Sequence, residues 1–507
     1  MSGATLEIRS PGDGGLLATF SVAGVDDVRR AVAAARTAQR EWGILSPTDR
    51  ARRLRRAARV FAEREAELVD TIRRETGKPS TEAVAEVLVT VDLIRYYARV
   101  APRHLRTRRV GTGWLLSRAA RVDREPYGVV GAITPWNYPL VLVMEAVTPA
   151  LFAGNAVVVK PSEATPLTAL KAGELLGAAG IPEGLVQVVV GNGTTGEALV
   201  EAGVDRIHFT GSSATGRKVM ASAARTLTPV TLELGGKDPA IVLEDADLDR
   251  AARGVVFGAF FNAGQTCISV ERVYVVRQVY AHFLAKVVEA ARTLRATTEG
   301  DHDVGPVIAP AQMAVIERHI EDAVARGARV LTGGRRTEPG SRVILPTVLA
   351  DVGDAMEVMR EETFGPLLPI AAVEDEDEAV RRANASGFGL FASVWTGDRR
   401  RGLRIARRLR AGGVSVNDVL SHFAVPALPM GGVGDSGFGR RRGVEALDEM
   451  TRTRTLLEDR GGLRKEPYWF PYSTTTERLL RALLLWRGIG GIPGAAALVR
   501  TLTGRKH

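Results

Sequence analysis

Gly128-Val-Val-Gly-Ala-Ile-Thr134 is the first of four short apolar runs that alternate with segments of helical character. The other runs are 155–160, 185–190 and 206–210, and the predicted helices between them span 140–152, 166–180 and 195–203. Strands that alternate with helices favour a parallel sheet with helices on its faces. A second alternating region has predicted strands at 240–243, 273–276, 328–331, 368–372 and 392–395. The sequence therefore predicts an α/β protein with two doubly wound domains.

The chain before these domains reads as a series of helices. An amphipathic helix is predicted at 25–42, and a second begins after Ser46-Pro47, a cap followed by proline in the first turn. A third helix is predicted after Pro79, with Ser80 as its cap.

Two further segments differ from both domains. Aromatic and β-branched residues around Gly111-Thr-Gly113 indicate a hairpin within 110–123, and the extended segment 451–457 is expected to pair with it. After residue 458, the chain carries an aromatic cluster at 467–472 and then a basic amphipathic helix at 477–487, which the glycines of 488–494 are expected to break.

Composition is that of an ordinary globular protein. The 507 residues are 45% hydrophobic and 25% charged, with a net charge of +10. Most of the basic residues are arginines spread along helices, whereas nucleic-acid binders cluster them with stacking aromatics. Aromatic residues make up only 6% of the chain, so we predict no nucleic-acid partner.

The cellular compartment is predicted from sequence features that the chain does not show. It shows no secretory signal and no apolar stretch long enough to span a membrane. A single cysteine fits a reducing compartment, so we expect a cytoplasmic protein, with peripheral contact to the inner face of a membrane as a further option.

That cysteine, Cys267, lies in Phe261-Asn-Ala-Gly-Gln-Thr-Cys267-Ile-Ser269. Its neighbours are small or polar, unlike the apolar surroundings of a buried structural thiol. A free cysteine is usually a small core residue, and the alternative is a nucleophile with activating groups elsewhere in the chain.

Two segments have the character of a nucleotide site. Phe209-Thr-Gly211-Ser-Ser-Ala-Thr-Gly216 follows a predicted strand and opens a helix, whose free amides suit a pyrophosphate. Lys160-Pro-Ser-Glu163 follows another strand end, where a carboxylate can bind ribose hydroxyls and repel a 2′-phosphate. Each segment alone is equally a surface turn. The literal Gly-x-Gly-x-x-Gly at Gly432-Val-Gly434-Asp-Ser-Gly437 follows no strand and reads as a glycine-rich turn.

Two further polar residues stand at strand ends. Glu233 is followed by two glycines in Thr231-Leu-Glu233-Leu-Gly-Gly-Lys237, and Asn137 lies between prolines in Thr134-Pro-Trp-Asn137-Tyr-Pro139. A loop glutamate and a turn asparagine are the plain interpretations of these residues taken singly.

Taken together, these segments resemble the aldehyde dehydrogenase superfamily over roughly residues 15–458. The matching segments are 135–137, 160–163, 209–212, 233–237, 262–267, 361–366 and 431–437. Within the superfamily, the chain is most similar to the group of succinate-semialdehyde dehydrogenase type 2 and diapolycopene-dialdehyde dehydrogenase.

The resemblance implies NAD(P)-dependent oxidation of an aldehyde to its acid through a thioester. It assigns the nucleophile to Cys267, the oxyanion donor to Asn137 and the base that activates water to Glu233. Because the branch that transfers the acyl group to coenzyme A commonly lacks this glutamate, hydrolysis is expected. NAD is the expected cofactor, with NADP possible, and no metal is expected. The implied cofactor-binding residues are Thr134, Pro135, Trp136, Asn137, Lys160, Ser162, Glu163, Gly193, Gly196, Phe209, Thr210, Gly211, Ser212, Thr215, Leu234, Gly235, Glu362 and Phe364.

The resemblance also implies an architecture. The NAD-binding, Rossmann-like domain is expected from 1–106 and 127–235, and the catalytic domain from 236–440. A small β arm for oligomerisation is expected from 107–126 and 448–459, followed by an amphipathic extension at 460–507. A homodimer or homotetramer is implied.

The chain also departs from the family pattern. Some members have a second glutamate where this chain has Arg441, which leaves Glu233 as the only candidate base. The expected substrate pocket is mostly apolar, which suits a hydrophobic aldehyde or semialdehyde. Glu145 stands where many members carry an aromatic residue, and it is expected either to turn away from the pocket or to disfavour an anionic substrate. The expected pocket residues are Tyr138, Met144, Glu145, Thr266, Ile268 and Met430.

Two questions remain open at this stage. The C-terminal helix could lie in a membrane interface through residues 467–500, or pack on the protein or at a subunit contact. The alternative to an enzyme is a catalytically silent scaffold that retains the fold, although Cys267, Glu233 and Asn137 are all present.

Overall fold

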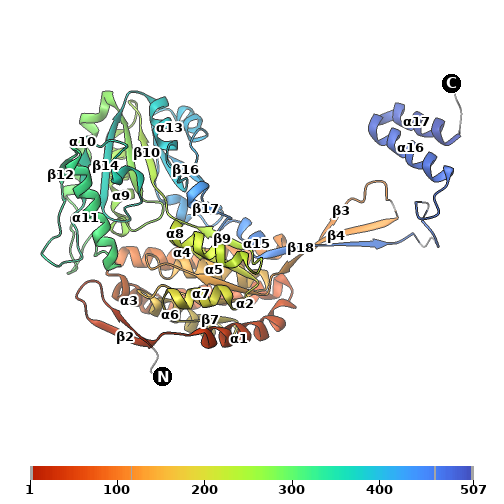
Figure 1. Ribbon diagram of the computed structural model, residues 1–507, viewed down its shortest axis with the longest axis horizontal. Coiled ribbons are helices and arrows are strands. Elements are labelled where there is room, and N and C mark those ends of the chain that lie inside the picture. Colours follow the sequence, from red (N-terminus) through yellow and green to blue (C-terminus); the bar gives the residue numbers. More distant parts are fainter. Residues whose placement is uncertain (1–3, 116, 462–463, 467, 504–507) are drawn as a thin grey trace. The chain divides into compact units, whose positions relative to one another are not determined.

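The computed structural model describes residues 4–115, 117–461, 464–466 and 468–503. They form two compact units, Met1–Leu105 with Glu125–Arg452, and Arg106–Arg124 with Thr453–His507. The first unit contains two separate, mainly parallel sheets, so the predicted fold class of two doubly wound α/β domains is confirmed (Figure 1). The residue limits predicted for the domains remain a prediction.

The first sheet has the strand order β17-β9-β8-β5-β6-β7. Five strands are parallel, and β17 pairs antiparallel with β9. The strands are β5 (Val129–Ile133), β6 (Ala156–Lys160), β7 (Val186–Val188), β8 (Arg206–Thr210), β9 (Val230–Glu233) and β17 (Gly437–Phe438). The chain proceeds outward from β5 through β6 to β7, then returns to β8 on the other side. This reversal makes the carboxyl ends of β5 and β8 the expected position of a ligand crevice.

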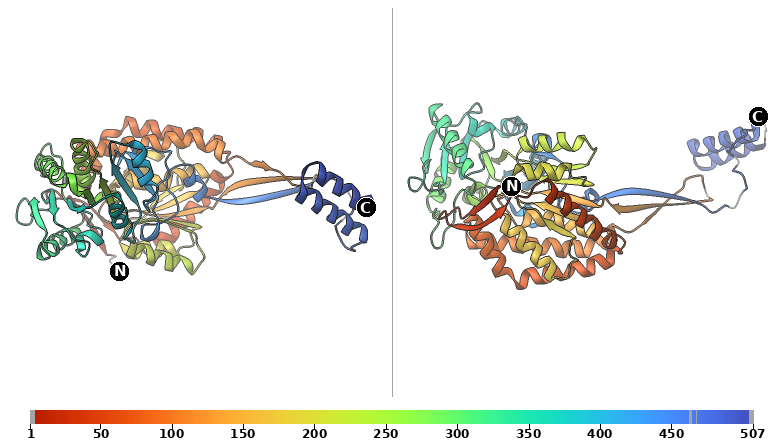
Figure 2. Two further views of the ribbon diagram at one scale, coloured as in Figure 1. Left: turned by 90° about the horizontal axis from the view of Figure 1, so that it is seen from above. Right: turned by 60° about the horizontal axis from the view of Figure 1, so that its bottom comes forward.

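Helices cover both faces of this sheet (Figure 2). On one face α1 (Val25–Gly43) packs on β6 and β7, beside α7 (Gly193–Glu201) and α8 (Ser213–Ala224). The helices associated with the other face are α2 (Pro47–Glu63), α3 (Glu65–Thr76), α4 (Ser80–His104), α5 (Val141–Ala153) and α6 (Pro166–Ala178). Ser46 caps α2 as predicted, by accepting a hydrogen bond from Asp49 N. The predicted cap Ser80 is wrong, because Ser80 is the first residue of α4 and the cap position belongs to Pro79.

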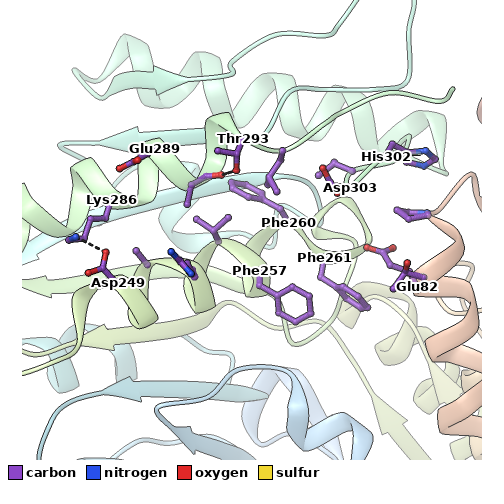
Figure 3. Close-up of a pocket in the computed structure, with 18 residues that line it drawn as sticks. Glu82, Asp249, Phe257, Phe260, Phe261, Lys286, Glu289, Thr293, His302 and Asp303 are labelled. Atoms are coloured by element: carbon purple, nitrogen blue, oxygen red, sulfur yellow. Dashed lines mark hydrogen bonds and ion pairs between the residues drawn. The ribbon is translucent and has the colours of Figure 1, made fainter. Parts of the chain in front are cut away.

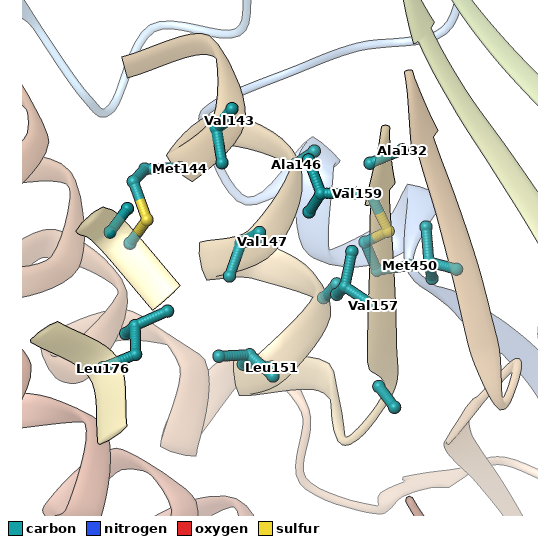
Figure 4. Close-up of a cluster of buried hydrophobic side chains, with 14 of the residues drawn as sticks. Ala132, Val143, Met144, Ala146, Val147, Leu151, Val157, Val159, Leu176 and Met450 are labelled. Atoms are coloured by element: carbon teal, nitrogen blue, oxygen red, sulfur yellow. The ribbon is translucent and has the colours of Figure 1, made fainter. Parts of the chain in front are cut away.

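Helix α5 lies at the centre of the core of this domain. All thirteen of its residues are buried, because α4 and the sheet contact opposite sides of it. Figure 4 shows Val143, Val147 and Leu151 of α5 among side chains of the sheet and of Leu176. A helix that is buried all round is expected to be apolar, so its single charged residue, Glu145, requires an explanation.

The second sheet has the order β12-β13-β14-β11-β10-β15-β16, in which only β12 is antiparallel. Its strands are β10 (Asp238–Val242), β11 (Val270–Val276), β12 (Arg329–Thr332), β13 (Thr347–Ala350), β14 (Leu367–Val373), β15 (Phe391–Trp395) and β16 (Gly413–Val416). Its helices are α9 (Leu248–Phe260), α10 (Arg277–Arg292), α11 (Pro310–Ala325), α12 (Glu357–Arg360), α13 (Glu376–Asn384) and α14 (Arg399–Ala406). Short elements complete the unit, namely β1 (Thr5–Arg9), β2 (Leu16–Ser21), η1 (Phe261–Gly264), η2 (Ser421–Ala424), η3 (Gly434–Ser436) and α15 (Glu445–Glu449).

The second unit contains a three-stranded arm and two helices. The arm has the order β18-β4-β3, built from β3 (Arg108–Val110), β4 (Arg118–Pro126) and β18 (Thr451–Asp459), which confirms the predicted hairpin and its third strand. The helices are α16 (Thr474–Ile489) and α17 (Gly491–Thr503). The predicted break is narrower than expected, since Gly490 alone, at φ 71°, separates them. Within the described part of the chain, no helix combines the length and apolar character that crossing a membrane requires.

Candidate active site

The predicted catalytic residues lie where the two sheets of the first unit meet. Glu233 is the last residue of β9, and Leu234–Lys237 connect it to β10, the first strand of the second sheet. The carboxyl edge of one sheet therefore faces the amino edge of the other, and Cys267 lies just before β11 at that amino edge. Gly236 is required in this connection, because a Cβ there would lie 2.7 Å from the Cys267 carbonyl oxygen.

A left-handed turn aims the Cys267 loop into this interface. Asn262 and Ala263 both have φ 54°, and Gly264 has φ 71°. Non-glycine residues adopt this conformation only where the surroundings hold them. Asn262 is held twice, since its N–H donates to Glu82 Oε1 at 2.9 Å and its Nδ2 donates to the Asn137 carbonyl oxygen at 3.0 Å.

Asn137 is buried and fixed from three directions. Its Nδ2 donates to the Gln265 carbonyl oxygen at 2.9 Å, and its own carbonyl oxygen also accepts from Lys78 Nζ at 2.9 Å. The second Nδ2 hydrogen is left for a ligand. The sequence did not identify Lys78 or Gln265 as site residues, although Gln265 lies inside the quoted Cys267 segment.

Cys267 and Glu233 share a buried environment with one cation. Arg441 Nη2 lies 3.1 Å from Glu233 Oε1. Burial raises the pKa of the Cys267 thiol well above its ordinary value, the Glu233 carboxylate adds to this, and Arg441 opposes it. Burial likewise raises the pKa of Glu233, and Arg441 again opposes the rise. Burial therefore favours the neutral form of both groups, and the fixed positive charge of Arg441 favours their anionic forms.

A cavity of about 200 Å³ opens beside Cys267. The predicted pocket residues Tyr138, Thr266 and Ile268 line it, and Tyr138 Oη and Thr266 Oγ1 form a 2.6 Å hydrogen bond. The lining is mostly apolar and includes four residues that the sequence did not identify, namely Leu142, Phe257, Phe261 and Phe423. Phe261 opens the quoted Cys267 segment, whereas Leu142, Phe257 and Phe423 come from α5, α9 and η2, so no single motif could have revealed all four.

Three predicted pocket residues lie elsewhere, and their assignment is corrected. Met144 is in the core of the first domain, on the side of α5 that faces Leu176 (Figure 4). Glu145 forms ion pairs with Arg441 and Arg442 instead of facing a substrate. Met430 packs in the core of the second domain and exchanges backbone hydrogen bonds with Arg441.

A larger cavity of about 650 Å³ lies on the second domain, between α9 and α10 (Figure 3). It shares Glu82, Phe257 and Phe261 with the cavity beside Cys267. Its far side carries charged residues, including Lys286 and Asp249, which form an ion pair at 2.6 Å. The two aromatic rings therefore stand between a small cavity at the thiol and additional space beyond it.

A third cavity, of about 740 Å³, lies at the carboxyl edge of the first sheet and fits the adenosine part of a dinucleotide. Predicted cofactor residues that line it are Lys160, Glu163, Gly193, Gly196, Phe209 and Thr215. Lys160 Nζ lies 3.2 Å from Glu163 Oε2, so the carboxylate is oriented at the cavity. This cradle beside a helix N-terminus matches the donors and acceptors that NAD offers.

The remaining predicted cofactor residues lie between this cavity and Cys267. Thr210, Gly211 and Ser212 lead into α8, and Ser212 Oγ accepts from Thr215 N. Thr134 and Ser162 are buried at strand ends, and Pro135 and Trp136 follow Thr134. The Trp136 and Phe364 rings meet edge to face with centroids 5.4 Å apart. Leu234 packs under Gly216 of α8, and a Cβ on Gly235 would lie 2.3 Å from Glu362 Oε2.

Glu362 carries an unusual carboxyl group. It accepts a hydrogen bond from Gly236 N at 3.0 Å, and burial raises its pKa to about 8. Behind it, the Glu271 carboxylate binds the N–H groups of Thr363 and Phe364 and pairs with Lys237 at 2.5 Å. The sequence did not identify Glu271 and Lys237, which fix the loop that carries Glu362.

One cluster among the described residues has the spacing of metal ligands, formed by His319, Glu357 and Glu361. Arg318 donates to Glu357 at 2.8 Å and to Glu361 at 3.4 Å. Because this guanidinium already neutralises both carboxylates, we assign no metal to the cluster.

Comparisons with known proteins agree with this geometry. A model of the aldehyde dehydrogenase family matches residues 1–456. The chain is 43% identical over 474 residues to the 4,4'-diapolycopene aldehyde oxidase of Methylomonas sp, covering 93% of this chain and 89% of that protein. It is 40% identical to a Mycobacterium tuberculosis protein named for NADP(+)-dependent succinate-semialdehyde dehydrogenase activity, over 92% of this chain and 90% of that one.

Solved structures give the same result. The NAD-dependent aldehyde dehydrogenase of Sinorhizobium meliloti superposes with a TM-score of 0.88 at 38% identity, covering 92% of this chain and 93% of that chain. Betaine aldehyde dehydrogenase of Staphylococcus aureus, solved in complex with NAD+, gives a TM-score of 0.88 at 31% identity, covering 92% of this chain and 94% of that chain.

The Glu82 carboxyl group should make stability depend on pH. Burial raises its pKa to about 7, so the folded protein favours the protonated form. The contribution of Glu82 to the free energy of unfolding is therefore greatest below the ordinary glutamate pKa and is lost as pH rises through 7. We expect Glu82→Gln to gain stability relative to the native protein between mildly acidic and mildly alkaline pH, by about 2 kcal/mol. Apparent melting temperature against pH measures this.

Glu41→Gln, an exposed change on α1, is the matched control and should follow the native curve at every pH. Parallel curves for the native protein and Glu82→Gln would contradict the assignment. The glutamine can still accept the hydrogen bond from Asn262 N, so loss of that bond should not confuse the result.

Proposed function

The chain belongs to the aldehyde dehydrogenase family, and from this premise we propose how its residues carry out the reaction and on which aldehydes. It is an NAD(P)-dependent enzyme that oxidises an aldehyde to a carboxylic acid. The roles of individual residues, the cofactor preference and the substrate class follow from the geometry around Cys267.

Cys267 is the nucleophile. Its thiol proton passes to Glu233, and the thiolate forms a bond to the aldehyde carbon while the carbonyl electron pair moves to oxygen. Asn137 Nδ2 and the Cys267 backbone N–H stabilise that oxyanion, and one such donor typically lowers the barrier by about 3 kcal/mol. The contacts of Asn137 with Gln265 and Lys78 keep the amide in place before substrate arrives.

NAD would supply the hydride acceptor for this oxidation, and the acyl group would remain on Cys267 as a thioester. Lys160 and Glu163 would hold the adenosine ribose, the start of α8 would hold the pyrophosphate, and Glu362 with Phe364 would position the nicotinamide end. Because the Glu163 carboxylate accepts ribose hydroxyls and repels a 2′-phosphate, NAD is preferred to NADP.

Glu233 then completes the turnover. Glu233 first releases the proton that it took from the thiol to solvent. Its carboxylate then removes a proton from water, the hydroxide attacks the thioester carbon, and the carbon–sulfur bond breaks to release the acid and the thiolate. Water and not coenzyme A is the acceptor, since a base is poised beside the thioester.

The substrate is an apolar aldehyde. The carrying observation is the lining of the cavity beside Cys267, which is mostly apolar and includes no Lys, Arg or His. A carboxylate on the substrate would have no cation to pair with there, and burying it unpaired is costly. The shared aromatic residues Phe257 and Phe261 give a long apolar chain a path toward further space.

A panel of aldehydes tests this function. With NAD, we expect kcat/KM for octanal and for a polyene aldehyde such as retinal to exceed that for succinate semialdehyde by about tenfold or more. With NADP in place of NAD, kcat/KM should fall. Glu163→Gln should reduce the ratio of kcat/KM with NAD to kcat/KM with NADP. NADH absorbance follows the reaction. Preference for succinate semialdehyde would refute the substrate class, and no turnover of any aldehyde despite bound cofactor would favour a silent scaffold.

Two variants should separate acylation from hydrolysis. Cys267→Ala is expected to bind NAD and form no NADH. Glu233→Gln is expected to release acid at least about a hundredfold more slowly, so that an acyl group accumulates on Cys267. Intact-protein mass spectrometry after mixing with NAD and octanal detects the adduct. Cys267→Ala is the control without adduct, and normal acid release by Glu233→Gln would contradict the assigned base.

The second unit carries two roles in this proposal. The arm β3-β4-β18 joins subunits into a homodimer or homotetramer, and α16 with α17 contacts a membrane surface. The helices pack on one another, and only Ala482 and Ala497 are buried among their described apolar side chains. Large apolar side chains remain exposed, including Phe470, Tyr472, Leu484, Ile489 and Ile492.

Charge favours a lipid surface as the partner of these helices. Helix α16 carries Arg478, Arg481 and Arg487 against a single acidic residue, Glu477. Exposed apolar side chains beside arginines are typical of a helix that lies in an anionic membrane interface. This arrangement would deliver a lipophilic aldehyde to a cytoplasmic enzyme.

Vesicle co-sedimentation tests the membrane contact. The full chain should pellet with phosphatidylserine-containing vesicles and much less with pure phosphatidylcholine vesicles, because attraction to anionic lipid adds to apolar burial. A chain that ends at Asp459 should remain in the supernatant while still oxidising a water-soluble aldehyde. Equal pelleting of both chains would refute the membrane contact.

Leu484→Glu with Ile492→Glu is the matched surface variant, since it keeps the arm and both helices. Loss of pelleting without a change in molar mass by light scattering supports a membrane role. A change in molar mass together with unchanged pelleting would assign these helices to a subunit contact instead.

A further inference from the structure

Arg441 belongs to a group of buried charges around the catalytic thiol. Arg441 and Glu145 side chains are completely inaccessible to solvent, and Glu233 and Arg442 are nearly so. Two guanidinium groups therefore face two carboxylates in the interior. Buried charges are tolerated only when they are paired, so the four groups depend on one another.

The geometry gives Arg441 and Arg442 different partners. Arg442 pairs with Glu145 Oε1, donates to the Phe423 carbonyl oxygen and lies 3.8 Å from the centre of the Phe423 ring. Arg441 reaches both carboxylates, with Nη1 at 2.9 Å from Glu145 Oε2 and Nη2 at 3.1 Å from Glu233 Oε1. Glu145 therefore anchors the guanidinium, whose other nitrogen points at the predicted base.

Arg441 also faces the sulfur. The guanidinium adjoins Glu233, whose Oε1 lies 3.1 Å from Arg441 Nη2, and its charge lowers the pKa of the Cys267 thiol. Among the largest influences on the pKa of Cys267, the charge of Arg441 favours the thiolate, while burial and the carboxylates of Glu233, Asp238 and Glu362 disfavour it.

The other titratable groups near this cluster do not compete with Arg441. Burial is the main reason that His208, which faces Arg441 from β8, has its pKa lowered to about 3 and stays neutral. Burial raises the pKa of Asp238 well above its ordinary value, as it does for Glu362, so both carboxyl groups favour the neutral form. Tyr97, which faces Glu145 and Arg442, also stays neutral because burial raises its pKa.

We propose that Arg441 is a positioning residue of the aldehyde oxidation, fixed by Glu145 so that its charge stabilises first the Glu233 carboxylate and then the Cys267 thiolate. The inference rests on the proposed roles of Cys267 and Glu233. In the step itself, the sulfur–hydrogen bond of Cys267 breaks and an oxygen–hydrogen bond forms on Glu233. Arg441 stays protonated and lies beside whichever of the two atoms carries the negative charge.

Alkylation of the thiol tests this without aldehyde or cofactor. Because the chain has one cysteine, the rate of iodoacetamide labelling of the full-length protein reports Cys267 alone. The pH midpoint of this rate should rise by about one unit or more in Arg441→Gln, since a nearby opposite charge shifts a titration by about one to three units. Arg441→Lys should restore most of the native profile.

Two further variants keep the result interpretable. Arg440→Gln is the matched control, because Arg440 donates to the Gly432 and Gly439 carbonyl oxygens and should label as the native protein does. Glu145→Gln removes the anchor of Arg441, so its labelling midpoint should move to higher pH, in the same direction as in Arg441→Gln. This shift remains measurable if Arg441→Gln fails to fold, as judged by circular dichroism.

The proposal is overturned if Arg441→Gln and Arg440→Gln label with the same pH profile, or if Glu145→Gln leaves the midpoint unchanged or lowers it. Its failure is distinct from failure of the proposed function. Shifted labelling in a protein that oxidises no aldehyde would uphold the role of Arg441 toward the thiol and refute the enzyme, whereas turnover with unshifted labelling would do the reverse.

Discussion

The antiparallel pairing of β17 with the end of β9 is the contact on which the site depends. Gly437 lies opposite Glu233, so a segment that follows the second domain completes the first sheet beside the base. Ser436 reinforces the pairing, since its carbonyl oxygen accepts from Leu234 N and its Oγ donates to the Gly235 carbonyl oxygen at 2.7 Å. A Cβ on Gly437 would lie 2.1 Å from the Leu232 carbonyl oxygen, so only glycine permits the pairing. The connection Leu234–Lys237 between the two sheets is therefore held by Ser436 as well as by Glu362, which accepts a hydrogen bond from Gly236 N.

This pairing also accounts for the charge in α5. The chain that leaves β17 reaches Arg441 and Arg442 within four residues and directs them at the buried helix. Glu145 would be untenable alone in a helix buried on all sides, and its two arginines would be equally costly without it. The charged group is therefore best understood as a unit that costs stability in the core and gives the thiol a permanent positive neighbour. Sites whose acid–base groups are tuned in this way commonly carry such a cost.

Sequence reasoning succeeded where a local pattern carries the information. Strand and helix alternation predicted both sheets, and the hairpin around Gly111-Thr-Gly113 and its third strand were correct. It failed where partners lie far apart in the chain. Met144 and Leu142 are both apolar residues of α5, yet Met144 faces the core and Leu142 faces the cavity. Because α5 is buried on every side, its sequence has no polar face from which the direction of each side chain could be predicted. The turn at Gly432–Gly437 likewise showed its role only through its pairing with β9, two hundred residues earlier in the chain.

The neutrality of the cavity beside Cys267 follows from the same arrangement. The acidic side chains at its wall already have partners, since Glu86 pairs with Lys78 at 3.0 Å and binds the N–H groups of Leu140 and Val141, while Glu82 binds Asn262 N. The lysine is in turn committed to the Asn137 carbonyl oxygen and lies 4.4 Å from the centre of the Tyr138 ring. The charges that build the site are thus used to hold Asn137 and the Cys267 loop. What they leave to the substrate is the set of aromatic and aliphatic side chains between them, which select by shape and apolar surface.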